Sequence, residues 1–306
     1  MMRIILLFCC SFVVSGCVAF DHSVVAEKKP LDMEAVSGHW VTRSRDTITP
    51  FLDVGKDHGN GTYDVELAGR RGLARGFYID NALILEVVPA VGDFKGKYCY
   101  ARLAYFGDKA VWVSLDPAAI WLDGNIPPER LKAKMRKITG DNYVLEGEGA
   151  DLTEMLKKMI AIPACAFLVL ERDVKVLLKP IPELPKYQPT LEYWYLARST
   201  LIWGANGIVS DRLSTLEKSG VISCSRKEAS ATLALIRQIP TDEVDLHVLA
   251  SMTSVAAALK DIESGDVDGE KTLNEALVRA EKERAKFCST NKVELPVLPR
   301  ISVQMR

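Results

Sequence analysis

Gly38-His39-Trp40-Val41 opens a run of short segments in which apolar and polar residues alternate. Alternation with a period of two turns one face of each segment toward a core, as in antiparallel sheets. Turn signals such as Asn60-Gly61 and Phe106-Gly107-Asp108 separate the segments. We therefore expect a meandering antiparallel sheet. Its predicted strands cover residues 48–54, 62–67, 73–78, 82–88, 98–106 and 109–115.

The opening of this run resembles the start of lipocalins. In that family a Gly-x-Trp motif begins the barrel and its Trp closes the barrel base, and Gly38-His39-Trp40 matches the motif. The resemblance covers about residues 36–180 and extends to uncharacterised lipoprotein modules of bacteria. It implies an antiparallel lipocalin-like meander or barrel with short flanking helices.

Beyond residue 115 the sequence predicts two short helices and three further strands. Asp151-Leu152-Thr153-Glu154 has the spacing of a capping box, which favours a helix directly after it. The predicted helices cover residues 129–137 and 155–160. The predicted strands cover residues 143–146, 166–170 and 174–178, and a turn at Glu171-Arg172-Asp173 joins the last two into a hairpin.

Four prolines mark a linker, because proline can continue neither a helix nor a central strand. They are Pro180, Pro182, Pro185 and Pro189, and we place the linker at residues 181–190. A helical domain is expected over residues 191–306. Within it, Ser225-Arg226-Lys227-Glu228 forms a capping box, and apolar residues from Val244 to Ile262 recur at helical spacing. The predicted class is therefore α+β, with a β domain at 38–180 and a small α-helical domain after it.

The first residues have the form of an export signal. Met1-Met2-Arg3 is positively charged, and the apolar stretch at residues 4–14 is shorter than the roughly 20 residues of a membrane span. Val14-Ser15-Gly16-Cys17 follows and resembles the lipobox of bacterial lipoproteins, where an apolar and two small residues precede a lipid-accepting cysteine. The resemblance implies cleavage between Gly16 and Cys17 and acylation of Cys17, with palmitate as a typical acyl group. The alternatives are an ordinary cleaved signal and an uncleaved anchor.

This signal predicts where the protein works. Residues 1–16 would be removed, Cys17 would tie the chain to a membrane, and residues 17–37 show no periodicity and are expected to be a tether. Val18 is not the aspartate that retains lipoproteins in the inner membrane of enteric bacteria. We therefore expect a cell-envelope protein at the outer membrane, facing the periplasm.

Four cysteines remain after processing: Cys99, Cys165, Cys224 and Cys288. Export brings them to a compartment where disulfides persist, and an even number suits pairing. Proximity along the chain favours Cys99 with Cys165 and Cys224 with Cys288, although three connectivities are open. The second pair is less favoured, because in a simple bundle the predicted helix ends that carry Cys224 and Cys288 lie at opposite ends, too far apart for a bridge. The alternative is buried free thiols.

No metal or cofactor site is expected. Residues 264–269 with Glu275 approach the spacing of an EF-hand calcium loop, but Ser264 replaces the first Asp and Lys271 stands where an apolar residue is usual. We favour a helix-to-helix turn capped by Asp268. The histidines are too far apart for a typical zinc motif; they are His22, His39, His58 and His247.

Charge and aromatic content leave two surfaces open to interpretation. The chain has 39 basic and 40 acidic residues without a basic block, which argues against nucleic acid as a partner. The basic residues of the helix predicted at 129–137 either contact anionic head groups or form a solvated face. Four aromatic residues either form a partner-binding patch or seal the two domains together; they are Tyr193, Trp194, Tyr195 and Trp203.

The sequence contains no nucleophile elbow, phosphate-binding loop or dinucleotide-binding motif. We therefore expect a non-enzymatic envelope lipoprotein that binds a protein partner or an apolar ligand. The alternative is an envelope hydrolase whose catalytic groups are dispersed along the chain, for example His39 or His58 with carboxylates.

Overall fold

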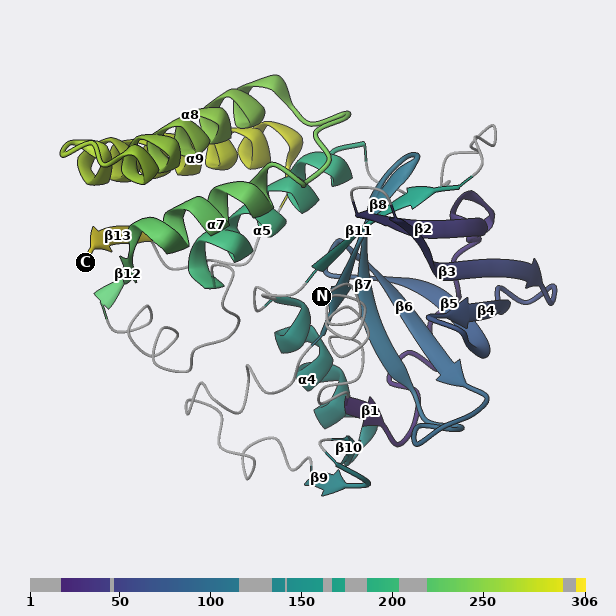
Figure 1. The fold of residues 1–306 in the computed structure, drawn as a ribbon. Coiled ribbons are helices and arrows are strands. Elements are labelled where there is room, and N and C mark those ends of the chain that lie inside the picture. Colours follow the sequence, from purple (N-terminus) through teal and green to yellow (C-terminus); the bar gives the residue numbers. More distant parts are fainter. Residues whose placement is uncertain are drawn as a thin grey trace. The chain divides into compact units, whose positions relative to one another are not determined.

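The computed structural model describes residues 18–44, 47–115, 134–140, 142–161, 167–173, 186–203, 219–293 and 301–306. The chain divides into two compact units, Met1–Ile162 with Ala166–Leu184 and Pro163–Cys165 with Pro185–Arg306. The step from residue 184 to residue 185 lies inside the proline-rich stretch at 181–190. The first unit contains the strands of the meander and the second contains the long helices (Figure 1).

Eight strands of the described chain form a closed antiparallel barrel (Figure 1). Closure comes from β11, Phe167–Arg172, which pairs with β8 on one side and with β2 on the other. The predicted α+β class with a lipocalin-like barrel is thereby confirmed. From β2 to β8 the order around the barrel follows the chain: β2 (Gly38–Ser44), β3 (Thr47–Asp57), β4 (Tyr63–Leu67), β5 (Arg70–Ile79), β6 (Ala82–Pro89), β7 (Cys99–Phe106) and β8 (Lys109–Ser114).

The turn predicted at Glu171-Arg172-Asp173 is wrong for its first two residues. Glu171 and Arg172 belong to β11, where they pair with Val41 and Trp40 of β2. These two pairs close the barrel, so ladder pairing overrides the local preference of charged residues for a turn. The second strand of the predicted hairpin, at 174–178, lies outside the described residues.

The outer face of the barrel carries a second apolar layer. Helix α4, Gly149–Ala161, packs Leu152, Met155 and Met159 against Phe77 and Ile84 of the barrel strands. Arg102 of β7 also donates from Nη1 to the Ile160 carbonyl oxygen, at 3.2 Å. This explains why β6 is apolar on both faces: one face lines the core and the other lies under α4.

A small sheet lies beside α4. Its order is β1 (Val18–Phe20), β10 (Tyr143–Glu146) and β9 (Lys134–Lys137), with β1 parallel and β9 antiparallel to β10. The strand predicted at 143–146 is thus confirmed. The helix predicted at 129–137 is wrong over residues 134–137, because those residues pair one by one with β10. Residues 129–133, which include Arg130 and Lys132, lie outside the described residues.

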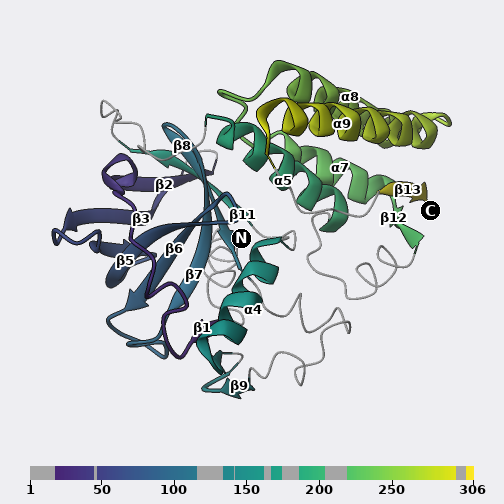
Figure 2. The same cartoon turned by 180° about the vertical axis from the view of Figure 1, so that it is seen from behind.

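The second unit is built on four described helices: α5 (Gln188–Trp203), α7 (Arg226–Ile236), α8 (Leu246–Ser264) and α9 (Gly269–Asn291). Ser225 and Glu228 form the predicted capping box at the start of α7. The apolar stripe of α8 is buried as predicted, and α8 and α9 lie side by side in both views (Figure 1, Figure 2). A parallel pair of strands, β12 (Val221–Cys224) and β13 (Ser302–Met305), completes the unit.

Candidate functional site

Residues 31–37, which we call the base segment, close the barrel core at its base. The short 3-10 helix Glu34–Val36 lies in this segment, and Leu31, Met33 and Val36 are buried in the same cluster as the inward-facing barrel residues. A Cβ on Gly76 of β5 would lie only 2.6 Å from the Met33 sulfur, so this close approach depends on glycine. The base segment is therefore part of the folded core.

Trp40 and Arg172 fasten the base segment to the barrel. The Trp40 side chain is 1% exposed, and its Nε1 donates to the Val36 carbonyl oxygen at 2.8 Å. The Arg172 guanidinium lies 4.5 Å from the centre of the Trp40 ring and donates to the carbonyl oxygens of Ala35 and Ser37. Trp40 thus lies where the Gly-x-Trp motif predicts, at the closed base of the barrel.

Aromatic side chains fill the barrel between its strands. Trp40 contacts Tyr105 edge to face, with ring centres 6.3 Å apart, and Phe51 contacts Trp112 in the same way at 5.5 Å. All four rings belong to one buried cluster that also contains Leu, Val or Ala side chains from every barrel strand except β2. An eight-stranded barrel is just wide enough for side chains to fill its interior or for one small ligand. The packed rings favour the first arrangement.

Tyr63 joins the base segment to β4 through polar contacts. Its hydroxyl oxygen accepts from the Met33 backbone N–H at 3.0 Å, and the hydroxyl donates to Asp32 Oδ1 at 3.0 Å. Burial raises the pKa of Tyr63 to about 12, with a further contribution from the Asp32 carboxylate. The neutral phenol is therefore the form that the folded barrel favours.

Residues 18–25, which we call the outer segment, lie on the outside of the barrel. Phe20 is fully buried, contacts the Tyr100 ring edge to face at 4.9 Å, and pairs with Tyr98 through two backbone hydrogen bonds of 2.7 and 3.0 Å. Val25 is buried in the same cluster as α4. The tether expected at 17–37 is therefore wrong for the outer and base segments. Their apolar residues lack periodicity because each packs on a different part of the barrel.

Glu86 is the centre of a polar network that holds the outer segment. Its side chain is 1% exposed on the outer face of β6, where Oε2 accepts from Ser23 Oγ and from the Tyr100 hydroxyl, both at 2.6 Å. Arg75 Nε donates to Oε1 at 3.0 Å, and Arg75 Nη2 donates to Ser23 Oγ at 3.2 Å. The Tyr100 hydroxyl oxygen accepts from the Val24 N–H at 3.0 Å. The buried carboxylate is thus fully hydrogen-bonded, as a buried charge requires.

Two groups in or near the outer segment, Tyr100 and Asp21, have shifted pKa values. Burial, followed by the Glu86 charge and hydrogen bond, raises the pKa of Tyr100 far above its usual range. A hydrogen bond from Lys97 lowers the pKa of Asp21, which lies in the outer segment at the surface. Around neutral pH the phenol donates to Glu86, and the Asp21 carboxylate accepts from the Lys97 ammonium.

The predicted processing residues directly precede the outer segment in the sequence. Gly16 and Cys17 are outside the described residues, and Val18, which follows Cys17 directly, pairs with Tyr143 as the first residue of β1. Cys99 begins β7, and its predicted partner Cys165 is outside the described residues, so that disulfide stays a prediction.

The predicted disulfide between Cys224 and Cys288 is wrong for this structure, in which Cys288 is a buried thiol. Cys224 pairs with Met305, whose backbone N–H donates to Glu270 in the first turn of α9. Cys288 lies eighteen residues further along that helix, which corresponds to about 27 Å. A bridge needs Cα atoms within about 7 Å. Burial raises the pKa of the Cys288 thiol, which keeps it protonated.

The histidines, the calcium-like stretch and the aromatic residues predicted from the sequence do not form a common site. His39 of β2 pairs with Asp53, and His58, which follows the end of β3, pairs with Asp64, each at 3.0 Å and at the surface. The calcium-like stretch is the turn between α8 and α9, as favoured, although Asp268 makes no side-chain cap. Within the described ranges no cluster of three or more metal-binding side chains occurs. Tyr193 and Trp194 are buried, which argues against an exposed aromatic patch.

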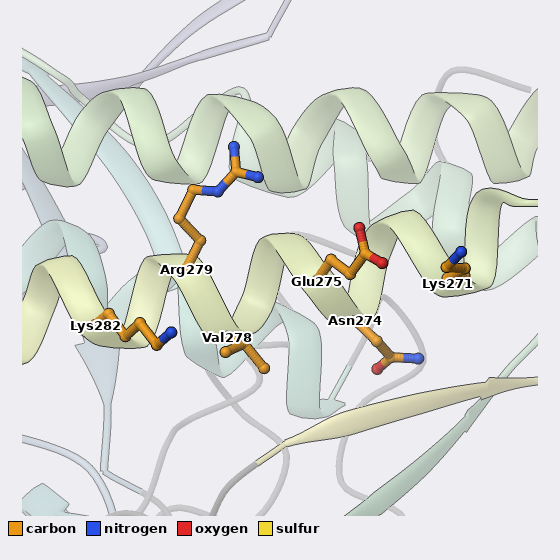
Figure 3. A pocket seen from close by; sticks show the side chains of 6 residues that line it. All are labelled: Lys271, Asn274, Glu275, Val278, Arg279 and Lys282. Atoms are coloured by element: carbon orange, nitrogen blue, oxygen red, sulfur yellow. The ribbon is translucent and has the colours of Figure 1, made fainter.

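An open depression lies along α9, with a volume of about 650 Å³ (Figure 3). Asn274 points toward β13, where it exchanges two hydrogen bonds of 2.8 Å with the Val303 backbone. Val278 is exposed between side chains of both charge signs. The described lining therefore offers no converging set of groups for one ligand. It consists of Lys271, Asn274, Glu275, Val278, Arg279 and Lys282.

Sequence reasoning missed the residues that fix the outer segment. Glu86 is the one charged residue in Ala82–Pro89, a strand that is otherwise apolar on both faces, and this was the available signal. Arg172 and Ser23 gave no local signal, because their partners are distant in sequence.

Among the described helices, none is both long and apolar enough to cross a membrane. The chain matches no family model, no curated protein and no solved structure.

Proposed function

We propose that this chain is a lipid-anchored lipoprotein of the bacterial cell envelope, cleaved between Gly16 and Cys17 and acylated at Cys17. The observation that carries the proposal is that the residues directly after Cys17 are folded onto the barrel. Residues 18–20 already form a strand, and Phe20 is fully buried. Cleavage before Cys17 would therefore remove the signal and keep every described residue that packs on the barrel.

The barrel serves in this proposal as a rigid scaffold that binds a protein partner. Its interior positions hold packed aromatic and aliphatic side chains, closed at the base by Trp40 and Arg172. This packing favours a protein partner over an apolar ligand within the barrel. Outer-membrane placement, facing the periplasm, follows from Val18 in the position where aspartate would retain a lipoprotein in the inner membrane.

Replacement of the lipid-accepting thiol tests the anchoring. Cys17→Ser is expected to abolish labelling by radioactive palmitate and to leave a chain of precursor size. The matched control is Cys10→Ser, which changes a cysteine of the signal and is expected to be labelled and processed like the natural chain. Normal labelling of Cys17→Ser, or its normal processing, would contradict the proposal.

Purification of the natural protein from gently solubilised envelope tests the scaffold role. We expect a protein to co-purify in a fixed ratio, and to be lost when the complex is dissociated by salt or denaturant. Mass spectrometry of the same sample identifies bound lipids. A free lipid at one molecule per chain, without a protein partner, would show instead that the barrel binds an apolar ligand.

A further inference from the structure

The described fold leaves no spacer between Cys17 and the barrel unit. Val18 is in register with Tyr143, and consecutive Cα atoms are 3.8 Å apart. A flexible tether would let a domain move tens of ångströms from its anchor. Here the anchor residue is instead the immediate neighbour of a paired strand.

Contacts on two sides of the outer segment also fix the position of Val18, the residue that follows Cys17. On one side β1 pairs with β10, and the Asp21 N–H donates to the Leu145 carbonyl oxygen at 3.0 Å. On the other side Phe20 pairs with Tyr98. The Glu86 network then holds Ser23 and Val24. The position of Val18, to which Cys17 is joined, is therefore set by the fold.

Parallel pairing places one end of the small sheet beside Cys17. Since β1 and β10 run in the same direction, the turn that precedes β10 lies at the end where β1 begins. We call Lys137, Ile138, Thr139, Asn142 and Tyr143 the entry end. Lys137 and Thr139 are exposed, and Lys137 Nζ lies 6.0 Å from the centre of the Tyr143 ring.

The loop between β6 and β7 braces this turn. Asp93 Oδ2 accepts from Thr139 Oγ1 at 2.6 Å and from Asn142 Nδ2 at 2.9 Å, and these two hydrogen bonds lower the pKa of Asp93. Phe94 packs in one cluster with Ala19 and Val144. The entry end is thus joined by hydrogen bonds to the barrel unit and lies beside Val18, the residue that follows Cys17.

Building on the proposed acylation of Cys17, we propose that the entry end rests on the lipid head-group layer of the membrane. Acyl chains on Cys17 would enter the hydrocarbon, so the residue itself would lie at the interface. Tyrosine suits that region because its ring is apolar and its hydroxyl is polar, and lysine reaches anionic head groups. Tyr143 and Lys137 are in register with Val18 across the three strands.

Amide hydrogen exchange on the intact lipidated protein tests this docking. The protein is reconstituted in vesicles of phosphatidylethanolamine and phosphatidylglycerol and compared with the soluble mature chain that carries Cys17→Ser. We expect exchange in peptides covering residues 137–143 to slow severalfold on vesicles. The turn at Gly107 and Asp108 is the internal control, because β7 separates it from the loop that braces the entry end. Eight strand residues span about 26 Å.

A spacer variant separates docking from anchoring. Insertion of about twelve Gly and Ser residues between Cys17 and Val18 gives a root-mean-square reach of about 20 Å. This variant is expected to sediment with vesicles while residues 137–143 exchange as fast as in the soluble chain. Unchanged exchange in the natural lipidated protein, or slow exchange that persists with the spacer, would overturn the docking and leave the anchoring intact. Absence of lipid on Cys17 would instead overturn the proposed function.

Discussion

The outer segment and the base segment precede the same barrel strand, yet they pack on different faces of the barrel. The base segment is buried with the inward-facing residues of the barrel, and Trp40 covers it. The outer segment packs on the outside of the barrel, where Phe20 and Val25 are buried in the cluster of α4, and it is also held by strand pairing and by hydrogen bonds to a buried carboxylate. Because the base segment is part of the core, we expect the integrity of the barrel to depend on it. The position of the anchor depends on the outer segment, and we expect this segment to open while the barrel stays folded.

The largest effect is expected for Trp40→Ala. The change removes a buried ring, its hydrogen bond to Val36 and its contacts with Tyr105 and Arg172. Loss of a buried aromatic side chain costs about 3–5 kcal/mol. Chemical denaturation of the mature chain measures the effect. His39→Ala is the matched control, because the neighbouring His39 side chain is 66% exposed. Equal stabilities of the two variants would contradict the role of the base segment.

Arg172→Leu is expected to have the next largest effect. It leaves the carbonyl oxygens of Ala35 and Ser37 without their guanidinium donor and removes the stacking on Trp40. Buried polar groups left unsatisfied cost about 1–3 kcal/mol. Arg43→Leu changes an arginine whose ion pair with Glu171 is exposed, and it should alter the free energy of unfolding by about 0.5 kcal/mol or less. A smaller loss for Arg172→Leu than for Arg43→Leu would refute the assignment.

Glu86→Gln is expected to lower the local stability of the outer segment and to leave that of the base segment unchanged. The variant keeps the shape of the side chain but removes the charge that accepts from Ser23, Arg75 and Tyr100. We expect faster amide exchange in residues 18–25, equivalent to about 1–3 kcal/mol of local stability. Exchange in the base segment should stay as in the natural chain. Glu66→Gln, in an exposed pair with Arg71, is the control. Equal acceleration in both segments would show that they open together.

The smallest effect concerns alkaline pH. The pKa of Tyr63 is raised from 10.0 to about 12, so folding favours the neutral phenol. Its contribution is fully present below pH 10 and is lost as pH rises through about 12, because the unfolded chain releases its proton first. Tyr63→Phe should therefore flatten the fall of stability between these values. Some fall will remain, because the pKa of Tyr100 is raised too. An unchanged slope would refute this assignment.

The barrel was predictable because its determinants are local. Alternating residues from Gly38 to Leu115, turn signals and the Gly-x-Trp motif specify strands, their faces and the buried Trp. The start of α7 was predictable for the same reason, since Ser225 and Glu228 are three residues apart.

The site was less predictable, because its determinants are distant in sequence. Ser23 and Glu86 are 63 residues apart, and Arg172 and Ala35 are 137 apart. The stretch Lys134–Lys137 has a composition that suits a helix, yet pairing with β10 makes it a strand. Such contacts become visible only once the chain has folded.

The central claim is that the mature chain begins with a lipid-bearing Cys17 joined directly to the outer segment. The most direct measurement is mass spectrometry of the amino-terminal peptide of the protein extracted from membranes. We expect a peptide that starts at Cys17 and carries the mass of a diacylglyceryl thioether. A peptide that starts at another residue, or one that starts at Cys17 without lipid, would contradict it.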